Sequence, residues 1–189
     1  MTSTRPLYGG AISSSLPSAF LDASDLRQVP DTQEVFLSPN SDLSLIIEVL
    51  ELVKDEGAGD SLEAAIKFHF SSLAHDNSAL SSNIDSINVP TIDKSTNGDS
   101  TRPEVQGPTV LTGTQSVSKF NKSPEEADTV LIQFALWRIP SKNADVTLCV
   151  NFPVKMGETG VELDPQEAKR VFEDAVRSFE IRDFGLFAG

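Results

Sequence analysis

Two carboxylates in a turn near the start of the chain are the residues best placed to do chemistry. Asp31 and Glu34 follow directly on Pro30, between two strand-like runs. Proline fixes its own φ angle, so Pro30 holds the acidic side chains at a defined position before the next element. Negative charges on a rigid turn suit contact with a basic protein surface. From the residues alone, an Asx turn at Asp31 is the simpler, purely structural explanation.

The charged residues just before this turn also have a structural interpretation. Either Asp22 or Asp25 can cap a short helical turn, and Arg27 can pair with a neighbouring acid. That explanation is sufficient for both aspartates.

The other reactive residue types do not form a recognisable catalytic motif. The two imidazoles, His69 and His75, are not accompanied by a G-x-S-x-G sequence or a reactive cysteine, and their spacing to other ligand residues predicts no metal site. His69 is expected to be a packed or surface residue of a helix. Without a G-x-x-x-x-G-K-[ST] motif, the chain is not expected to bind or hydrolyse GTP itself. Spacing does not decide whether two carboxylates meet as in a glycosidase, so an unrecognised hydrolase stays open.

The composition predicts one globular domain that spans residues 1–189, with 39% hydrophobic and 23% charged residues. The net charge is -13, and the first sixty residues hold three basic and ten acidic groups. Nucleic acid and anionic membranes are therefore not expected partners. A basic protein surface fits this charge better, although acidity can also serve solubility alone.

The single cysteine, Cys149, excludes a disulfide framework and indicates a reducing compartment. The N-terminal residues do not form a signal peptide, and no apolar run approaches membrane-spanning length. We expect a soluble, intracellular protein without a cofactor.

Hydrophobic periodicity and turn residues predict the elements in chain order. Expected strands are Pro6–Ser15, Gln33–Leu37, Asn83–Val89, Pro108–Phe120, Thr129–Ile139 and Asp145–Val154, with a closing strand or tail at Glu180–Ala188. Glycines within the first of these suggest a bulge. The Thr129–Ile139 strand is apolar on both faces and is predicted to be central in the sheet. The Asp145–Val154 strand alternates between apolar and polar residues and is predicted to have one solvent-exposed face.

Three helices are predicted. Ser41 caps the first, which runs to about Lys54 and is apolar over so wide an arc that deep burial is expected. Asp60 caps the second. The third has the clearest signal, because Asp164, Pro165 and a following Glu form a capping sequence. Between the second helix and the long strands, residues 74–106 are rich in Ser, Asn and Asp, which predicts a long mobile loop around one short strand.

Strands joined by short connections pair antiparallel, and helices between them pack on the sheet faces. The sequence therefore favours an α+β fold with a mainly antiparallel sheet over an alternating βαβ series.

Several segments also resemble a known family. The LYGGAI sequence, the DAS-DLR-VPDTQEVF run from Asp22 to Phe36 and the closing DFGLFA are similar to the Ran guanine nucleotide release factor (Mog-one) family. The likeness spans most of the chain and is poor from Ala74 to Gln106. It implies about six antiparallel strands flanked by helices, a fold shared with the photosystem protein PsbP.

The resemblance also implies a role for the acidic turn. In the family, the acids of the VPDTQEV motif contact Ran, and they match Asp31 and Glu34 here, so a binding role becomes the favoured one for both. Pro30 and Gln33 match as well and are expected to shape the turn or add a contact. Asp25 and Arg27 also match and are expected to border the site.

The activity implied is binding to a basic surface of Ran, promotion of guanine nucleotide release and retention of nucleotide-free Ran in support of nuclear protein transport. No bond chemistry is implied. A monomer found in nucleus and cytoplasm is expected, with a Ran-binding helper protein as an open question. The alternatives are a binding module for another basic protein or small ligand on the same scaffold, and the unrecognised hydrolase.

Overall fold

The computed structural model describes residues 1–189 except 60, 91–101, 119–126, 155–164 and 188–189. Its strands are β1 Thr2–Leu7, β2 Ile12–Pro17, β3 Leu21–Asp22, β4 Gln33–Leu37, β5 Ser44–Glu51, β6 Ser81–Asn88, β7 Gln106–Val117, β8 Asp128–Ile139, β9 Ala144–Val154 and β10 Glu180–Ile181. The helices are α1 Leu62–Asp76 and α2 Pro165–Ser178, with short 3-10 turns η1 Tyr8–Gly10, η2 Ala23–Asp25, η3 Asp55–Gly57, η5 Pro140–Lys142 and η6 Phe184–Phe187.

Two antiparallel sheets organise the described chain. The main sheet has seven strands in the order β3-β4-β5-β9-β8-β7-β6, and a smaller sheet has the order β1-β2-β10. The predicted α+β antiparallel fold is confirmed, with one strand more than expected in the main sheet. The small sheet was not predicted, because β10 pairs with β2 from the far end of the sequence.

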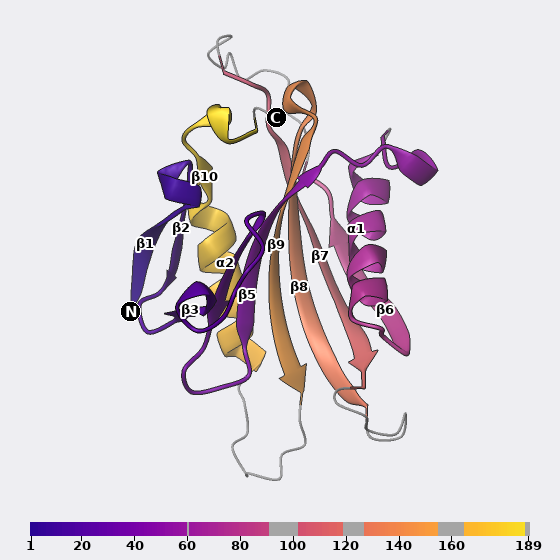
Figure 1. Ribbon diagram of the computed structural model, residues 1–189. Coiled ribbons are helices and arrows are strands. Elements are labelled where there is room, and N and C mark those ends of the chain that lie inside the picture. The colour runs from indigo at the N-terminus through magenta and orange to yellow at the C-terminus, as the bar shows by residue number, and fades with distance from the viewer. Residues whose placement is uncertain (60, 91–101, 119–126, 155–164, 188–189) are drawn as a thin grey trace.

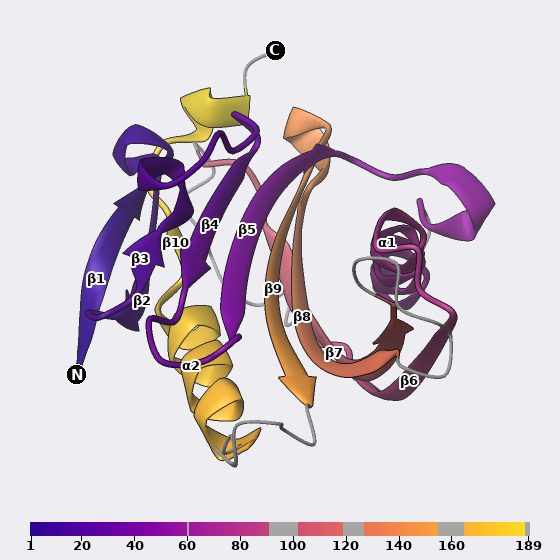
Figure 2. The same ribbon diagram turned by 60° about the horizontal axis from the view of Figure 1, so that its bottom comes forward.

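Each face of the main sheet has its own hydrophobic core. On one face the core contains residues of α2 and of the small sheet, such as Val171, Phe172, Leu7 and Ile12. On the other it contains Ile66 and neighbouring residues of α1. The strands curl round α1, and α2 lies on the opposite side (Figures 1 and 2). The interior of the sheet is therefore covered on both sides.

The segment predicted to be the first helix, Ser41–Lys54, contains strand β5 instead. β5 pairs antiparallel with β4 on one side and β9 on the other. Leu45 and Ile47 are buried in the core beneath α2, whereas Ile46 packs on the other core. A strand with both faces covered is apolar at nearly every position, and such a run does not show the alternation that separates strand from helix.

The predicted first strand, Pro6–Ser15, is two strands joined by a tight reversal. Tyr8, Gly9 and Gly10 all have positive φ angles, of 50°, 66° and 96°. Glycine adopts this region without strain, so the glycines make the reversal between β1 and β2 rather than the predicted bulge. Tyr8 adopts the same region despite its side chain.

The long strands differ from expectation at one point. β8 is an interior strand with both faces covered, as predicted: Phe134 lies in one core and Trp137 in the other. β9 is the middle strand of the seven, and residues 144–150 are all buried, so the predicted solvent-exposed face of Asp145–Val154 is wrong. Side chains of α2 and α1 cover the two faces of this strand.

The remaining helices are close to prediction. Ser61 caps α1, its Oγ accepting a hydrogen bond from Ala64 N at 3.3 Å. The predicted caps Asp60 and Asp164 lie outside the described residues. α1 continues to Asp76 and β6 begins at Ser81, so the described part of residues 74–106 holds more regular structure than expected. Within the described chain, no helix is both long and apolar enough to cross a membrane.

Candidate functional site

The acidic turn, defined as Pro30 to Glu34, leads into β4 near one edge of the main sheet. Gln33 N donates to Pro30 O and Val49 N donates to Thr32 O, both at 2.9 Å. Main-chain hydrogen bonds therefore fix the turn to itself and to β5. The Asp31 side chain is exposed, and it has no hydrogen bond or ion pair to any residue that the structure describes.

Glu34 is half-buried and held in place by the turn between β1 and β2. Its Oε1 accepts a hydrogen bond of 2.7 Å from Tyr8 N. The Tyr8 hydroxyl in turn donates to Thr32 O and to Ile47 O, both at 2.9 Å. Within the described residues Oε2 of Glu34 has no such bond, so the carboxylate is oriented but still able to accept hydrogen bonds from a partner.

Tyr8 is a persistent donor in this arrangement. Burial is the main cause of a raised pKa for its hydroxyl, and the negative charges of Glu34 and Glu48 raise it further. The phenol therefore stays protonated at physiological pH. Tyr8 thus anchors the acidic turn through both its main chain and its side chain.

Gln33 and Glu34 lie on opposite faces of β4, because side chains alternate along a strand. Gln33 Nε2 donates to Glu48 Oε1 at 2.9 Å, across the pair of residues that face each other in β4 and β5. Glu48 adds a negative charge beside the acidic turn. Sequence reasoning missed this relation because it predicted a helix for the segment that contains Glu48, and recognition of β5 as a strand would have revealed it.

The structure places Asp25 and Arg27 in and just after η2, which packs against β4. Both are exposed. Asp22 is the cap, since its Oδ1 accepts from Ser24 N at 2.8 Å, so the predicted capping role is confirmed for Asp22 rather than Asp25. Arg27 has no ion pair with any described residue, and its predicted pairing with a neighbouring acid is wrong there.

A buried ionic cluster, which sequence reasoning did not predict, lies on the side of β5 away from β4 and is centred on Asp145 of β9. Asp145 is fully buried, and its carboxylate binds Arg138 Nε at 2.9 Å, His69 Nε2 at 2.8 Å and Val53 N at 3.0 Å. Arg138 also donates to the carbonyls of Val53 and Ala58. His69 is thus a packed helix residue, as predicted, and the cluster ties the segment between β5 and α1 to the sheet.

The remaining reactive side chains give no catalytic constellation in the described chain. His69 lines a pocket of about 470 Å³ with Phe68 and Ser72, but its hydrogen bond goes to Asp145 and not to a nucleophile. Cys149 is buried, which raises the pKa of its thiol and keeps it protonated. Among the residues that the structure describes, no cluster of three or more His, Cys, Asp or Glu could hold a metal ion.

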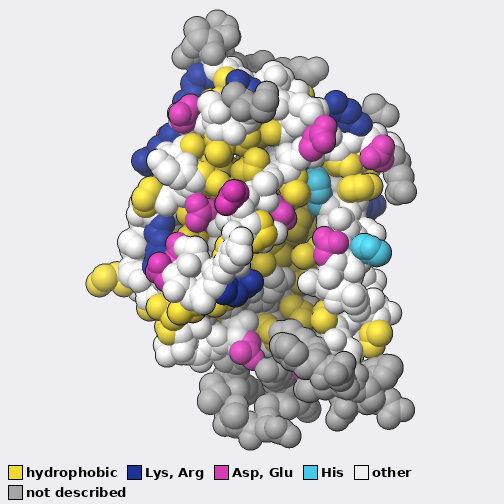
Figure 3. All heavy atoms as spheres, viewed as in Figure 1, with side chains coloured by type: hydrophobic (Ala, Val, Ile, Leu, Met, Phe, Trp, Pro, Cys, Tyr) yellow, Lys and Arg dark blue, Asp and Glu magenta, His cyan; other side chains and the backbone are white. Residues whose placement is uncertain are grey.

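On the face seen in Figure 3, acidic side chains are scattered around an exposed band of hydrophobic side chains. Carboxylates held on a fixed turn can accept charge-assisted hydrogen bonds from another molecule. A family model described as Ran-interacting Mog1 protein matches residues 5–153. The chain belongs to this family.

Individual relatives match over nearly the full chain. A Ran guanine nucleotide release factor from Danio rerio is 32% identical over 190 residues, 97% of this chain and 99% of that protein. Nuclear import protein MOG1 from Saccharomyces cerevisiae is 30% identical over 206 residues, 96% of this chain and 83% of that protein. The crystal structure of the Saccharomyces cerevisiae Ran-binding protein Mog1p has a TM-score of 0.75 at 28% identity and covers 99% of this chain and 98% of that one. The predicted family is confirmed.

Proposed function

We propose that this protein binds the GTPase Ran, promotes release of its guanine nucleotide and holds Ran in a nucleotide-free complex that supports nuclear protein transport. The observation that carries the proposal is the exposed carboxylate of Asp31, which has no partner among the described residues, in the same turn as the anchored carboxylate of Glu34. The names of the relatives, Ran guanine nucleotide release factor and nuclear import protein, support Ran as the partner that we propose for this acidic turn.

Asp31 and Glu34 form the centre of the proposed contact. Pro30 shapes the turn, Gln33 reaches the neighbouring Glu48, and the exposed Asp25 and Arg27 are proposed to border the interface. The turn is fixed by main-chain hydrogen bonds, so little conformational freedom would be lost when a basic partner binds. A preorganised acidic surface also steers a basic partner during encounter.

Release follows from linkage between two binding equilibria. If the protein prefers empty Ran, bound nucleotide weakens its affinity for Ran by the same factor by which the protein weakens nucleotide binding. No bond needs to be made or broken. We propose that the carboxylates act by pairing with basic groups of Ran or by disturbing the magnesium ion beside the nucleotide, and that the protein acts as a monomer in the nucleus and cytoplasm.

The decisive experiment mixes the protein with Ran that carries a labelled guanine nucleotide and records release. The wild-type protein should accelerate release, and Asp31→Ala and Glu34→Ala should each weaken the complex by about 2 to 5 kcal/mol, the usual cost of removing one partner of a buried interfacial charge pair. Asp76→Ala is the matched control, since it removes an exposed acid at the end of α1.

The other outcomes separate the alternatives. Stable binding without release would indicate a binding module, and no response to Ran would return attention to hydrolase chemistry. Wild-type affinity in both turn variants, with folding intact by circular dichroism, would contradict the assigned contact.

A further inference from the structure

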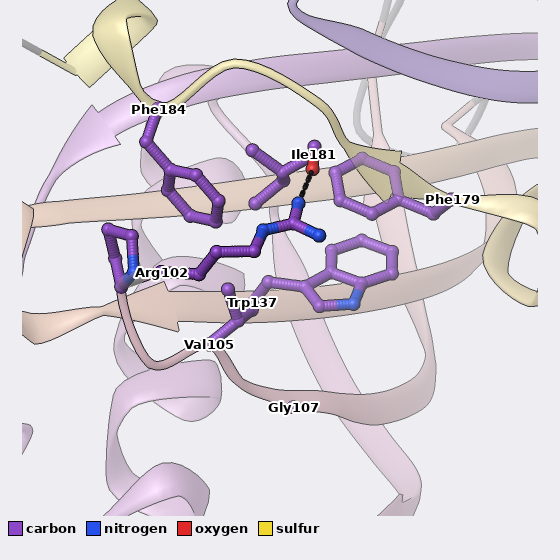
Figure 4. A pocket seen from close by; sticks show the side chains of 8 residues that line it. Arg102, Val105, Gly107, Trp137, Phe179, Ile181 and Phe184 are labelled. Carbon is purple, nitrogen blue, oxygen red and sulfur yellow. Dashed lines mark hydrogen bonds between the residues drawn. The ribbon is translucent and has the colours of Figure 1, made fainter. Parts of the chain in front are cut away.

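A second site lies away from the acidic turn, where the start of β7 and the C-terminal segment meet β8. A pocket of about 360 Å³ opens here (Figure 4). Trp137 of β8 forms part of its floor, and Phe179, Ile181 and Phe184 approach from the segment after α2. Its volume falls in the lower part of the range of small-molecule sites.

The apolar part of the pocket is rigid. The rings of Trp137 and Phe179 are stacked, with centroids 3.8 Å apart and an angle of 16° between their planes. Trp137 is only 5% exposed. Because this pair is packed into the core beneath α2, it presents a fixed aromatic surface that does not have to be assembled when a ligand binds.

One cation is placed above this surface. Arg102 donates from Nη2 to Ile181 O at 2.9 Å, and its guanidinium carbon lies 5.6 Å from the centre of the Phe184 ring (Figure 4). Its Nε and Nη1 make no hydrogen bond with any described residue. No carboxylate is among the described residues that line the pocket. In a protein of net charge -13, this is a positive group oriented by its neighbours but not neutralised by them.

Gly107 keeps the loop that carries Arg102 against Trp137. A Cβ at this position would lie 2.5 Å from Leu136 O, and the φ angle of Gly107 is +128°. Only glycine permits so close an approach of two main chains in this conformation. The close main-chain contact at Gly107 thus fixes this wall of the pocket in the fold.

We propose that this pocket binds a small apolar carboxylate, whose body lies on the Trp137–Phe179 surface and whose anionic group pairs with the free donors of Arg102. Guanidinium forms its strongest hydrogen bonds with carboxylates and phosphates. The described lining has one cation and apolar walls, which favours a carboxylate, because no second cation among these residues would balance a doubly charged phosphate.

The chain supplies its own reporter, because Trp137 is its only tryptophan. We would titrate the full chain with 3-phenylpropanoate and with the uncharged 3-phenylpropan-1-ol, recording tryptophan fluorescence excited beyond phenyl absorption and the single indole N–H signal by NMR. The acid should bind about tenfold or more tightly than the alcohol, the factor expected for one charge-assisted contact.

Arg102→Met keeps an apolar stem and should abolish this preference, while Arg177→Met, on an exposed residue of α2, should retain it. Val105→Phe would fill the pocket while Trp137 stays the only tryptophan, and it should block both ligands. The proposal is overturned by equal affinity for acid and alcohol, by an unchanged preference in Arg102→Met, or by no spectral change up to about 10 mM, a concentration that would detect even weak small-ligand binding.

Discussion

The acidic turn and the buried ionic cluster use the same chemical group in opposite ways. Asp145 is completely buried and has three donors within the chain, whereas Asp31 is exposed and has no partner among the described residues. Burial of a carboxylate is tolerated only when donors compensate for the lost water. The first carboxylate is therefore committed to the fold, and the second remains available to another protein.

The largest effect expected from this comparison is on folding. Asp145→Ala leaves the buried Arg138 guanidinium without its counter-charge and should lower the free energy of unfolding by about 3 to 5 kcal/mol. Urea denaturation followed by circular dichroism measures this. Asp76→Ala, which removes an exposed acid, should change the same quantity by less than about 0.5 kcal/mol. A loss below about 1 kcal/mol in Asp145→Ala would show that the cluster adds little to stability.

At the acidic turn we expect the opposite of Asp145→Ala, namely little effect on stability and a large effect on binding. Asp31→Asn keeps the shape of the side chain and should leave the free energy of unfolding within about 0.5 kcal/mol of wild type. The same change should weaken the Ran complex by about 2 to 5 kcal/mol, because a buried partner charge is left unpaired. Isothermal titration calorimetry and urea denaturation on one preparation separate the two quantities. Parallel losses in both would mean that Asp31 supports the fold.

A change at Tyr8 is expected to affect both stability and binding, because Tyr8 stabilises the turn and orients Glu34. The Tyr8 hydroxyl has one proton, which Thr32 O and Ile47 O share, so Tyr8→Phe removes one shared hydrogen bond worth about 0.5 to 1.5 kcal/mol but keeps the main-chain donor to Glu34. Stability should fall by about 0.5 to 1.5 kcal/mol, and Ran affinity by less than in Glu34→Ala. An affinity loss as large as that of Glu34→Ala would place Tyr8 itself in the contact.

The smallest effect should be on association kinetics. Exposed charges act through screened long-range attraction, so the association rate with Ran should fall as salt rises from about 0.05 to 0.3 M, with a shallower slope for Asp31→Asn. Stopped-flow mixing measures both slopes. A rate independent of salt would remove steering from the proposal while leaving the contact itself intact.

Local signals predicted much of this molecule. α2 begins at its Pro165, and β7 to β9 follow the predicted strand pattern, because caps, prolines and alternation act over a few residues. The helix predicted for the segment that contains β5 was wrong, because burial on both faces of a strand removes that alternation. The small sheet and the Asp145 cluster join residues far apart in the chain, and single-sequence patterns do not encode which distant partners meet.

The candidate site likewise combines local features, which the sequence predicts, with contacts between distant residues, which it does not. The turn at Pro30 and the exposure of Asp31 follow from neighbouring residues, whereas the anchor of Glu34 comes from Tyr8, in the turn that joins β1 and β2 of the small sheet. Glu48 became part of the site only once β4 and β5 were aligned.

The small sheet joins strands that are synthesised at very different times, because β10 follows β1 and β2 by more than 160 residues. β2 is completed by β10, and Ala11 O accepts hydrogen bonds from Arg182 N and Asp183 N, which the ribosome makes long after Tyr8. Until those residues emerge, the hairpin that orients Glu34 lacks its third strand. If the proposed contact is correct, a nascent chain would therefore capture the GTPase slowly until Arg182 and Asp183 have left the ribosome.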